Sequence, residues 1–308
     1  MTDSRPLLAG VELGGTKCIC ILGTGADDIR KQVRVPTGEP DTTLARINSV
    51  LDAWRATYPP PAAIGLASFG PLDLRRGSPA FGQITSTAKP GWVGTDIVAR
   101  LGVHRGIPIG FNTDVNGAAL AEGRWGAARG LEDYAYVTVG TGVGVGLVVG
   151  GRPVFGCNHS ELGHMRVVRH GGDDWPGACP FHGDCVEGLV SGPAIAARAG
   201  MPASEIPAAS PVWELVAHTL AQLLQTMFLA TAPQRVLIGG GVVEHRADLL
   251  ERVQRLVVEN MNGYLNLEDL TGGMNHYVVA PGLGSLAGPL GALALAAEAL
   301  TSALAAAS

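Results

Sequence analysis

Two segments of the same design open the two halves of this 308-residue chain and limit the folds that it can adopt. Residues 7–23, LLAGVELGGTKCICILG, and residues 134–150, YAYVTVGTGVGVGLVVG, each place a glycine turn between two runs of strand-forming residues. Each segment predicts a β-hairpin, and together they predict that a similar unit begins in each half. The sequence contains no shorter repeat of the kind that builds solenoids or propellers.

Strand-like and helical segments alternate along the rest of the chain. Residues 42–57 carry apolar side chains at helical spacing, and the prolines at 59–61 end that helix. Further strands are expected at 63–71, 107–111 and 235–241, and further helices at 115–122, 211–231, 246–261 and within 281–308. This alternation predicts an α/β protein built in layers. The border between two domains is expected near residues 112–120.

Glycine supplies 44 of the residues, about twice its usual share. Since glycine weakens helices and strands, this excess indicates tight turns or backbone that approaches a ligand closely. Hydrophobic residues make up 46% and charged residues 16%, which suits a packed core and argues against disorder. The formal net charge of -5 provides no basic surface for nucleic acid, so no nucleic-acid partner is expected.

The two ends of the chain carry no signal for export or membrane insertion. Residues 1–8 contain no long apolar run, which argues against a signal peptide. The C-terminal GALALAAEALTSALAAAS is mostly alanine, carries Glu298 and is too weakly apolar to span a bilayer, so a docked helix is expected. Five cysteines, an odd number, do not describe a disulfide framework. A cytoplasmic protein without a membrane partner is therefore expected.

Three glycine-rich turns are candidates for binding phosphate, because glycine lets the backbone come close to a bulky anion and point amide hydrogens at it. The first turn lacks the Walker A spacing, and an ordinary hairpin turn is the alternative for it and for the second. The third follows an apolar strand, at the strand end where ligands bind in α/β folds. Two such hairpins suit a polyphosphate such as ATP. The candidate residues are Gly14, Gly15, Thr16 and Lys17, then Gly140, Thr141 and Gly142, then Gly239, Gly240 and Gly241.

Asn112 and Asp114 follow a predicted strand and precede a predicted helix. From local sequence alone, an Asp at this place can simply cap the helix. The functional alternative is a general base, because a sugar hydroxyl needs a carboxylate within hydrogen-bond reach as it attacks phosphorus. Asn112 would then fix the position of the hydroxyl.

His164, Cys179, His182 and Cys185 form the strongest local signal in the chain. They offer four ligands of the types that bind tetrahedral Zn²⁺, and a closed set of this kind suits a structural metal in a loop with few apolar residues. A chance cluster of buried Cys and surface His is the alternative. Glu161 and Glu187 lie beside this cluster in the sequence. They are either solvated surface carboxylates or acceptors for sugar hydroxyls.

Taken together, these residues resemble the ROK family of sugar kinases and repressors, and its bacterial fructokinase branch most closely. The similarity runs nearly end to end, from ELGGTK at 12–17 to PGLGSLAGPLGA at 281–292. The motifs that carry it in between are SFGPLD at 68–73, TAKPGW at 87–92, HSELGH at 159–164, CPFHGDCVEGLVSGPA at 179–194 and LIGGGVVEH at 237–245.

The resemblance implies an actin-like ATPase (ribonuclease H-like) fold, in which two α/β domains close on a ligand cleft between them, and it implies ATP with Mg²⁺. It makes Asp114 the catalytic base and assigns ATP to the three glycine turns. It places Asn112, Glu161, His164 and Glu187 at the sugar and assigns Zn²⁺ to His164, Cys179, His182 and Cys185. Glu12 stands where many ROK kinases have Asp, and the metal set has two His and two Cys; both departures favour the fructokinase branch.

The expected reaction is ATP-dependent phosphorylation of D-fructose to fructose 6-phosphate, catalysed by a homodimer. Domains are expected at 1–116, completed by a C-terminal helix at 290–308, and at 117–289 with the zinc loop. One alternative is a ROK hexokinase that acts on mannose, glucose or an N-acetylhexosamine. A sugar-responsive repressor is less favoured, because the first hairpin leaves no room for the helix-turn-helix of family repressors. A non-catalytic sugar sensor is less favoured because Asp114 and all the glycine turns are present.

Overall fold

Sheets and helices alternate along the chain in the computed structural model, which confirms the predicted α/β class. The structure describes residues 5–101, 106–244, 246–265 and 273–307. His245 of the LIGGGVVEH motif and residue 308 of the expected C-terminal helix lie outside the described residues.

The chain divides into two units, each with its own sheet. Unit 1 comprises Met1–Arg129, Phe155–His159 and Ser285–Ser308, and unit 2 comprises Gly130–Val154 and Ser160–Gly284. The domain border expected at residues 116/117 stays a prediction; the contacts put all of helix α3 (Asp114–Trp125) in unit 1.

Unit 1 contains a five-stranded sheet in the order β3-β2-β1-β4-β5. The hairpin predicted at 7–23 is present, and β2 pairs antiparallel with both β1 and β3. The other two strands run parallel to β1, so the carboxyl ends of β1, β4 and β5 meet at one edge. The strands are β1 (Leu8–Leu13), β2 (Lys17–Gly25), β3 (Asp28–Pro36), β4 (Ala63–Ser68) and β5 (Ile109–Thr113).

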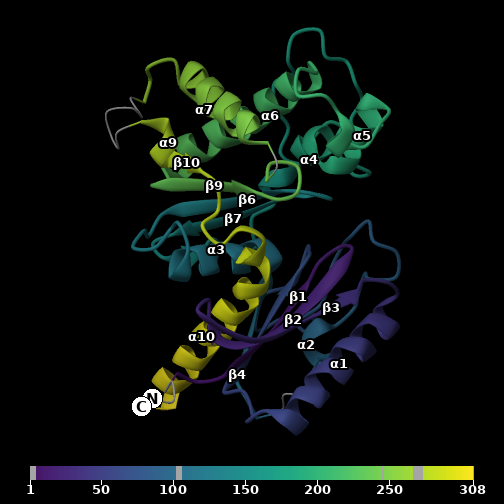
Figure 1. The fold of residues 1–308 in the computed structure, drawn as a ribbon, viewed down its shortest axis with the longest axis vertical. Coiled ribbons are helices and arrows are strands. Elements are labelled where there is room, and N and C mark those ends of the chain that lie inside the picture. Colours follow the sequence, from purple (N-terminus) through teal and green to yellow (C-terminus); the bar gives the residue numbers. More distant parts are fainter. Residues whose placement is uncertain (1–4, 102–105, 245, 266–272, 308) are drawn as a thin grey trace. The chain divides into compact units, whose positions relative to one another are not determined.

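Helix α10 (Ala287–Ala307) packs with α3 on the sheet of unit 1, as Figure 1 shows. The approach is close: a Cβ on Gly65 of β4 would overlap the carbonyl of Ala292. By length and composition, the segment 284–307 is also apolar enough to cross a bilayer. Its residues from Ala287 to Ala297 are buried in the unit, apart from the partly exposed Gly288, which confirms the predicted docked helix. The other helices of the unit are α1 (Pro40–Thr57) and α2 (Ile97–Arg100).

Unit 2 repeats this design with a sheet in the order β10-β9-β6-β7-β8. The second predicted hairpin forms β6 and β7, and β9 and β10 run parallel to β6 on its other side. Each sheet therefore has a central strand that is antiparallel to one neighbour and parallel to the other. The strands are β6 (Tyr134–Val139), β7 (Val143–Val149), β8 (Arg152–Pro153), β9 (Arg235–Gly239) and β10 (Val278–Val279).

The core of unit 2 lies between this sheet and its two long helices. The apolar face of α6 (Val212–Thr231) is buried along the whole helix, from Trp213 to Phe228, and α7 (Ala247–Met261) packs beside it (Figure 1). Shorter elements carry the rest of the unit: η2 (Leu162–His164), α4 (Val186–Val190), α5 (Gly192–Ala199), η3 (Ala203–Glu205) and α9 (Met274–Tyr277); η4 (Gly284–Leu286) precedes α10.

Candidate active site

The carboxyl edge of the unit 1 sheet brings the first glycine turn and Asp114 to the same side. Leu13 at the end of β1 lies opposite Ser68 of β4, and Ser68 lies opposite Thr113 of β5. The turn that begins at Gly14 and the helix that begins at Asp114 therefore leave the sheet at one edge. This is the edge at which α/β proteins bind ligands.

Thr113, and not Asp114, caps helix α3. The Thr113 hydroxyl accepts a hydrogen bond from the Asn116 amide at 3.2 Å, and Asp114 is already the first helical residue. The reading of Asp114 as a helix cap is therefore wrong. One of its carboxylate oxygens accepts from the Val115 amide at 2.9 Å. Burial raises the pKa of Asp114 to about 6, although hydrogen bonds from the backbone act in the other direction.

Glu12 provides a second carboxyl group in unit 1. Burial, and after it the charge of Asp114, raise the pKa of Glu12 to about 7, while Lys17 lowers it. Helix α10 lies against this side chain, because a Cβ on Gly288 would overlap the Glu12 carboxyl. The sequence signal for Glu12 is an ionisable residue inside the apolar strand LAGVEL. Its interaction with Asp114 could not be predicted from sequence spacing.

Hydrogen bonds from the first residues of α3 and its cap hold the side chain of Asn112 in place. Its side-chain oxygen accepts from the Asn116 side chain at 2.8 Å and from the Thr113 amide at 2.9 Å. These bonds use the acceptor of the side chain and leave its amide hydrogens for a further partner. Asn112 can therefore donate to a hydroxyl group beside Asp114.

The first glycine turn is closed by a hydrogen bond from the Gly14 amide to the Lys17 carbonyl at 3.1 Å. The Thr16 carbonyl accepts from the Thr37 amide, also at 3.1 Å. Within the described residues, the amides of Gly15 and Thr16 donate to no protein group. Two adjacent exposed N–H groups in a turn are suited to an anion.

The other two glycine turns lie together at the carboxyl edge of the unit 2 sheet. β6 and β9 are parallel neighbours that end at Val139 and Gly239. Gly240 has a φ of 92°, and a Cβ there would overlap the backbone of Val139. The carbonyl of Gly140 also accepts from the amide of Gly192, the first residue of α5, at 2.7 Å. Unit 2 thus brings the turns at 140–142 and 239–241 together.

Glu187 and Glu161 lie in different surroundings within unit 2. One carboxylate oxygen of Glu187 accepts from the Val143 amide at 3.0 Å, so this side chain contacts the turn at 140–142. Glu161 is exposed and directly precedes η2. A Cβ on Gly163 in η2 would overlap the Val143 carbonyl, so only glycine lets this short helix lie so close to β7.

The predicted metal ligands converge within unit 2. One ligand atom from each of His164, Cys179, His182 and Cys185 lies within 4.8 Å of all the others. Nδ1 of His164 is 3.3 Å from Nδ1 of His182, 3.7 Å from Sγ of Cys179 and 3.6 Å from Sγ of Cys185. Zinc bonds of about 2.1 Å to nitrogen and about 2.3 Å to sulfur place tetrahedral ligand atoms roughly 3.4–3.8 Å apart. The separations measured from His164 are close to these values, so the types and positions of the four residues suit a tetrahedral zinc ion.

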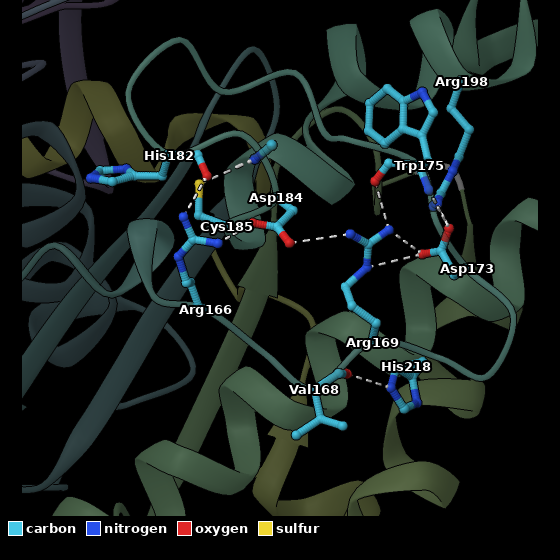
Figure 2. Close-up of polar contacts among 11 residues, drawn as sticks. Arg166, Val168, Arg169, Asp173, Trp175, His182, Asp184, Cys185, Arg198 and His218 are labelled. Carbon is cyan, nitrogen blue, oxygen red and sulfur yellow. Dashed lines mark hydrogen bonds and ion pairs between the residues drawn. The ribbon is translucent and has the colours of Figure 1, made fainter.

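A chain of ion pairs supports the segment that carries two of these ligands (Figure 2). Asp184, between His182 and Cys185, forms ion pairs with Arg166 and with Arg169. Arg166 also donates to the carbonyl of His182 at 3.1 Å. We call the linked side chains of Arg166, Asp184, Arg169, Asp173 and Arg198 the loop brace.

The inner end of the loop brace is well enclosed. Asp173 and Arg198 keep only 10% and 9% of their side-chain surface exposed, and Asp173 pairs with both Arg169 and Arg198. The guanidinium of Arg198 lies over the ring of Trp175, 4.9 Å from its centroid. This network was not predicted from the sequence, because its paired members are 4 to 25 residues apart and no periodicity links them.

A model described as the ROK family matches residues 8–299. The chain belongs to the ROK family. A ROK hexokinase from Thermus thermophilus has a similar structure, with a TM-score of 0.76, 28% identity and coverage of 96% of this chain and 99% of the other. The duplicated sheet order is accordingly that of the actin-like ATPase fold, as expected.

Relatives within the ROK family include two proteins named fructokinase. The Zymomonas mobilis protein is 41% identical over 306 residues, which cover 96% of this chain and 98% of the relative. The Pediococcus pentosaceus protein is 36% identical over 297 residues, which cover 96% of this chain and 100% of the relative. The predicted resemblance to the fructokinase branch is thus confirmed.

Proposed function

We propose that this ROK protein transfers the terminal phosphoryl group of ATP, bound as its Mg²⁺ complex, to the 6-hydroxyl of D-fructose. The relatives named fructokinase are 41% and 36% identical to it, whereas the ROK hexokinase is 28% identical. This difference favours fructose. Phosphorylation of mannose, glucose or an N-acetylhexosamine is the second candidate, supported by the structural likeness to that hexokinase.

The observation that carries the proposal is the Asp114 carboxyl at the start of α3, with a pKa of about 6. A general base works best when its pKa lies near the operating pH, because it is then mostly ionised and still basic enough to take a proton. Since Thr113 caps the helix, the second carboxylate oxygen of Asp114 is left for a substrate.

In the proposed reaction, Asp114 accepts the proton of the 6-hydroxyl as its oxygen attacks the terminal phosphorus. A bond forms between that oxygen and phosphorus, the bond from phosphorus to the bridging oxygen breaks, and the electron pair leaves with ADP. Glu12, whose pKa is about 7, holds a proton for much of the time at neutral pH and leaves Asp114 as the ionised member of the pair. The amides of Gly15 and Thr16 stabilise charge on the phosphoryl oxygens.

Each unit carries groups of its own that suit a nucleotide or a sugar. In unit 1, Asn112 donates to a sugar hydroxyl, and the turn at 14–17 binds phosphate. In unit 2, Glu161 and Glu187 accept from sugar hydroxyls. The turns at 140–142 and 239–241 bind the rest of ATP, which their position at the carboxyl edge of the sheet supports.

Zinc would be held by His164, Cys179, His182 and Cys185 and would supply structural order to their loop. The distances between the ligand atoms support this assignment. Because His164 turns its Nδ1 toward the cluster, its proton belongs on Nε2 when the metal is bound. His164 would then donate from Nε2 to a sugar hydroxyl, which gives it both roles expected from the sequence.

A panel of sugars tests the proposal. ADP release is measured with ATP, Mg²⁺ and each of fructose, mannose, glucose and N-acetylglucosamine, with a sample lacking sugar as the control. Fructose is expected to give the highest kcat/KM, at least about tenfold above the others, which corresponds to a difference of about 1.4 kcal/mol. A higher value for another sugar would establish the second candidate instead. No sugar-dependent ADP release with any of them would exclude a sugar kinase.

The cellular location and the oligomeric state of the protein belong to the same proposal, and membership of the ROK family supports both. We place it in the cytoplasm, where ATP is available, and we expect a homodimer. Light scattering on the purified protein would measure its mass in solution, and a value equal to that of one chain would contradict the dimer.

A further inference from the structure

The chain contains three lysines among its 22 basic residues, and two of the three lie beside the first glycine turn. Lys17 begins β2 directly after the turn. Lys89 comes from the segment TAKPGW, and its Nζ donates to the carbonyl of Gly15 at 2.5 Å. The third, Lys31, lies on the edge strand β3. A chain that otherwise relies on arginine thus concentrates its lysines at one turn.

The position of Lys89 is set by a buried anchor. Trp92, three residues further on, is fully buried. Its indole N–H donates to the Gly38 carbonyl at 2.9 Å, and its ring packs edge-on against Phe69 with centroids 5.2 Å apart. The Lys89 amide also donates to the Thr87 hydroxyl at 3.2 Å. The backbone that carries Lys89 is therefore tied to the core of unit 1, while the ammonium group extends to the turn.

The charge of Lys89 has no counter-charge among the described residues. Neither Lys89 nor Lys17 forms an ion pair within the described ranges. The Gly15 carbonyl is a neutral acceptor and occupies only one of the three hydrogens of the Lys89 ammonium group. Space is open beside Gly15, because a Cβ placed there would meet no atom within 4 Å. The Lys89 ammonium group and the free amides of Gly15 and Thr16 thus border an open volume at the turn.

We propose that Lys89 binds the terminal phosphoryl group of ATP and remains with it during transfer. This inference rests on the proposed function, which it extends by naming a further residue that contacts the transferred group. An ammonium group is a compact charge that can follow a phosphoryl group from a neutral acceptor, whereas the planar guanidinium of arginine favours a fixed two-point contact. Lys89 exchanges no proton in this step; it neutralises charge on the phosphoryl oxygens.

The alternative is that Lys89 only holds the turn in shape through the Gly15 carbonyl. The two roles differ in what they do to different nucleotides. A residue that contacts the terminal phosphate affects ATP and its analogues but not ADP. A residue that shapes the turn affects all nucleotides and the melting temperature of the protein.

The test compares Lys89→Met and Lys89→Arg with the parent, and Lys31→Met serves as the matched lysine control. Dissociation constants for ADP and for the non-hydrolysable analogue AMPPNP are measured by calorimetry, together with kcat for fructose phosphorylation. Lys89→Met is expected to weaken AMPPNP binding by about tenfold or more and ADP binding by less than about threefold, as for loss of a charged hydrogen bond. Its kcat is expected to fall by about a hundredfold. Lys89→Arg, which keeps the charge, should recover part of both losses.

Each other outcome overturns a definite part of the account. Equal losses of ADP and AMPPNP binding, with a lower melting temperature, would show that Lys89 only shapes the turn. Unchanged AMPPNP binding and kcat in Lys89→Met, or equal effects of Lys31→Met, would overturn the proposal. If the parent phosphorylates no sugar at all, the proposed function fails, while the AMPPNP and ADP measurements still decide whether Lys89 contacts the terminal phosphate.

Discussion

At the scale of single residues, Thr113 caps helix α3, and this leaves the carboxyl group of Asp114 available to a substrate. The hydroxyl of Thr113 caps α3, so Asp114 keeps one oxygen for chemistry and sits where the amides of the first helical turn stabilise its negative form. Burial acts against that form and raises its pKa to about 6. The balance leaves a carboxylate that is ionised at neutral pH and is a stronger base than an exposed one.

We expect Asp114→Ala to lower kcat by at least about a hundredfold, since loss of a general base has effects of this size. Coupled ADP release with fructose measures it. Asp52, which is exposed on α1, provides the matched control, and Asp52→Ala should leave kcat unchanged. An Asp114→Ala variant with near-normal turnover would show that another group accepts the proton.

The raised pKa also predicts how activity depends on pH. Asp114 accepts a proton only when ionised, so kcat of the parent should be level from about pH 7 upward and should reach half of that level near the pKa of about 6. Below this pKa, kcat should fall about tenfold per pH unit. Stability moves in the opposite direction. Because the folded pKa lies above the ordinary value of 3.8, the folded state loses stability as pH rises from about 4 to about 6. A pH profile that stays flat down to pH 5 would contradict Asp114 as the base.

At the scale of elements, the loop brace connects the loop that carries His182 and Cys185 to α5. Its inner pair, Asp173 with Arg198, is nearly buried, while Arg166 at the outer end keeps 67% of its side chain exposed. An exposed ion pair contributes at most about 1 kcal/mol to the stability of the folded state. The loop is therefore stabilised chiefly by the inner pair and by Asp184, which two arginines contact.

Asp184→Asn breaks both of these ion pairs while keeping the shape of the side chain. We expect zinc to pass to a chromophoric chelator at least about tenfold faster than from the parent, as for other groups that orient metal ligands. Glu259→Gln, which breaks an exposed ion pair with Arg255 on α7, is the control and should change nothing. The melting temperatures of the metal-free forms should be equal.

Two results would contradict this account of the loop brace. Equal rates of zinc loss from Asp184→Asn and from the parent would remove the support role of Asp184. Purified parent protein that contains no zinc would contradict the metal assignment itself.

Most of the long helices and both hairpins could be predicted from the sequence, whereas an edge strand and two short helices could not. Both hairpins, α1, α6, α7 and α10 follow from periodicity and glycine turns, because these segments bury one face or one run of side chains. Strand β3 was missed: it is the edge strand, its sequence DIRKQVRVP is mostly polar, and it pairs only with β2. Helices α4 and α5 were missed because they are short and follow a loop of glycine, cysteine and histidine.

The candidate site was predictable where its residues lie close in the sequence. Cys179, His182 and Cys185 are three residues apart, and the structure joins them with His164 as expected. Contacts between residues far apart in the chain could not be predicted from the spacing of residues in the sequence. Lys89 meets Gly15 across 74 residues, and the effect of Asp114 on Glu12 depends on the pairing of three strands. Only the register of the sheet brings these groups together.

At the scale of the whole molecule, the two units share one sheet design but carry different functional groups. Both carry a glycine turn at the carboxyl edge of the central strand. Unit 1 adds the paired carboxyl groups of Glu12 and Asp114 and the lysines, and unit 2 adds the cluster of Cys and His. The same frame thus supplies the proposed base in one unit and the proposed metal centre in the other.

Identification of the product tests the central claim most directly. Purified protein is incubated with ATP, Mg²⁺ and fructose, and the products are followed by ³¹P nuclear magnetic resonance. The account predicts that the terminal phosphate signal of ATP is replaced by that of fructose 6-phosphate, and that Asp114→Ala forms it at least about a hundredfold more slowly. Phosphate on a different hydroxyl, free phosphate without a sugar ester, or equal product from Asp114→Ala would contradict it.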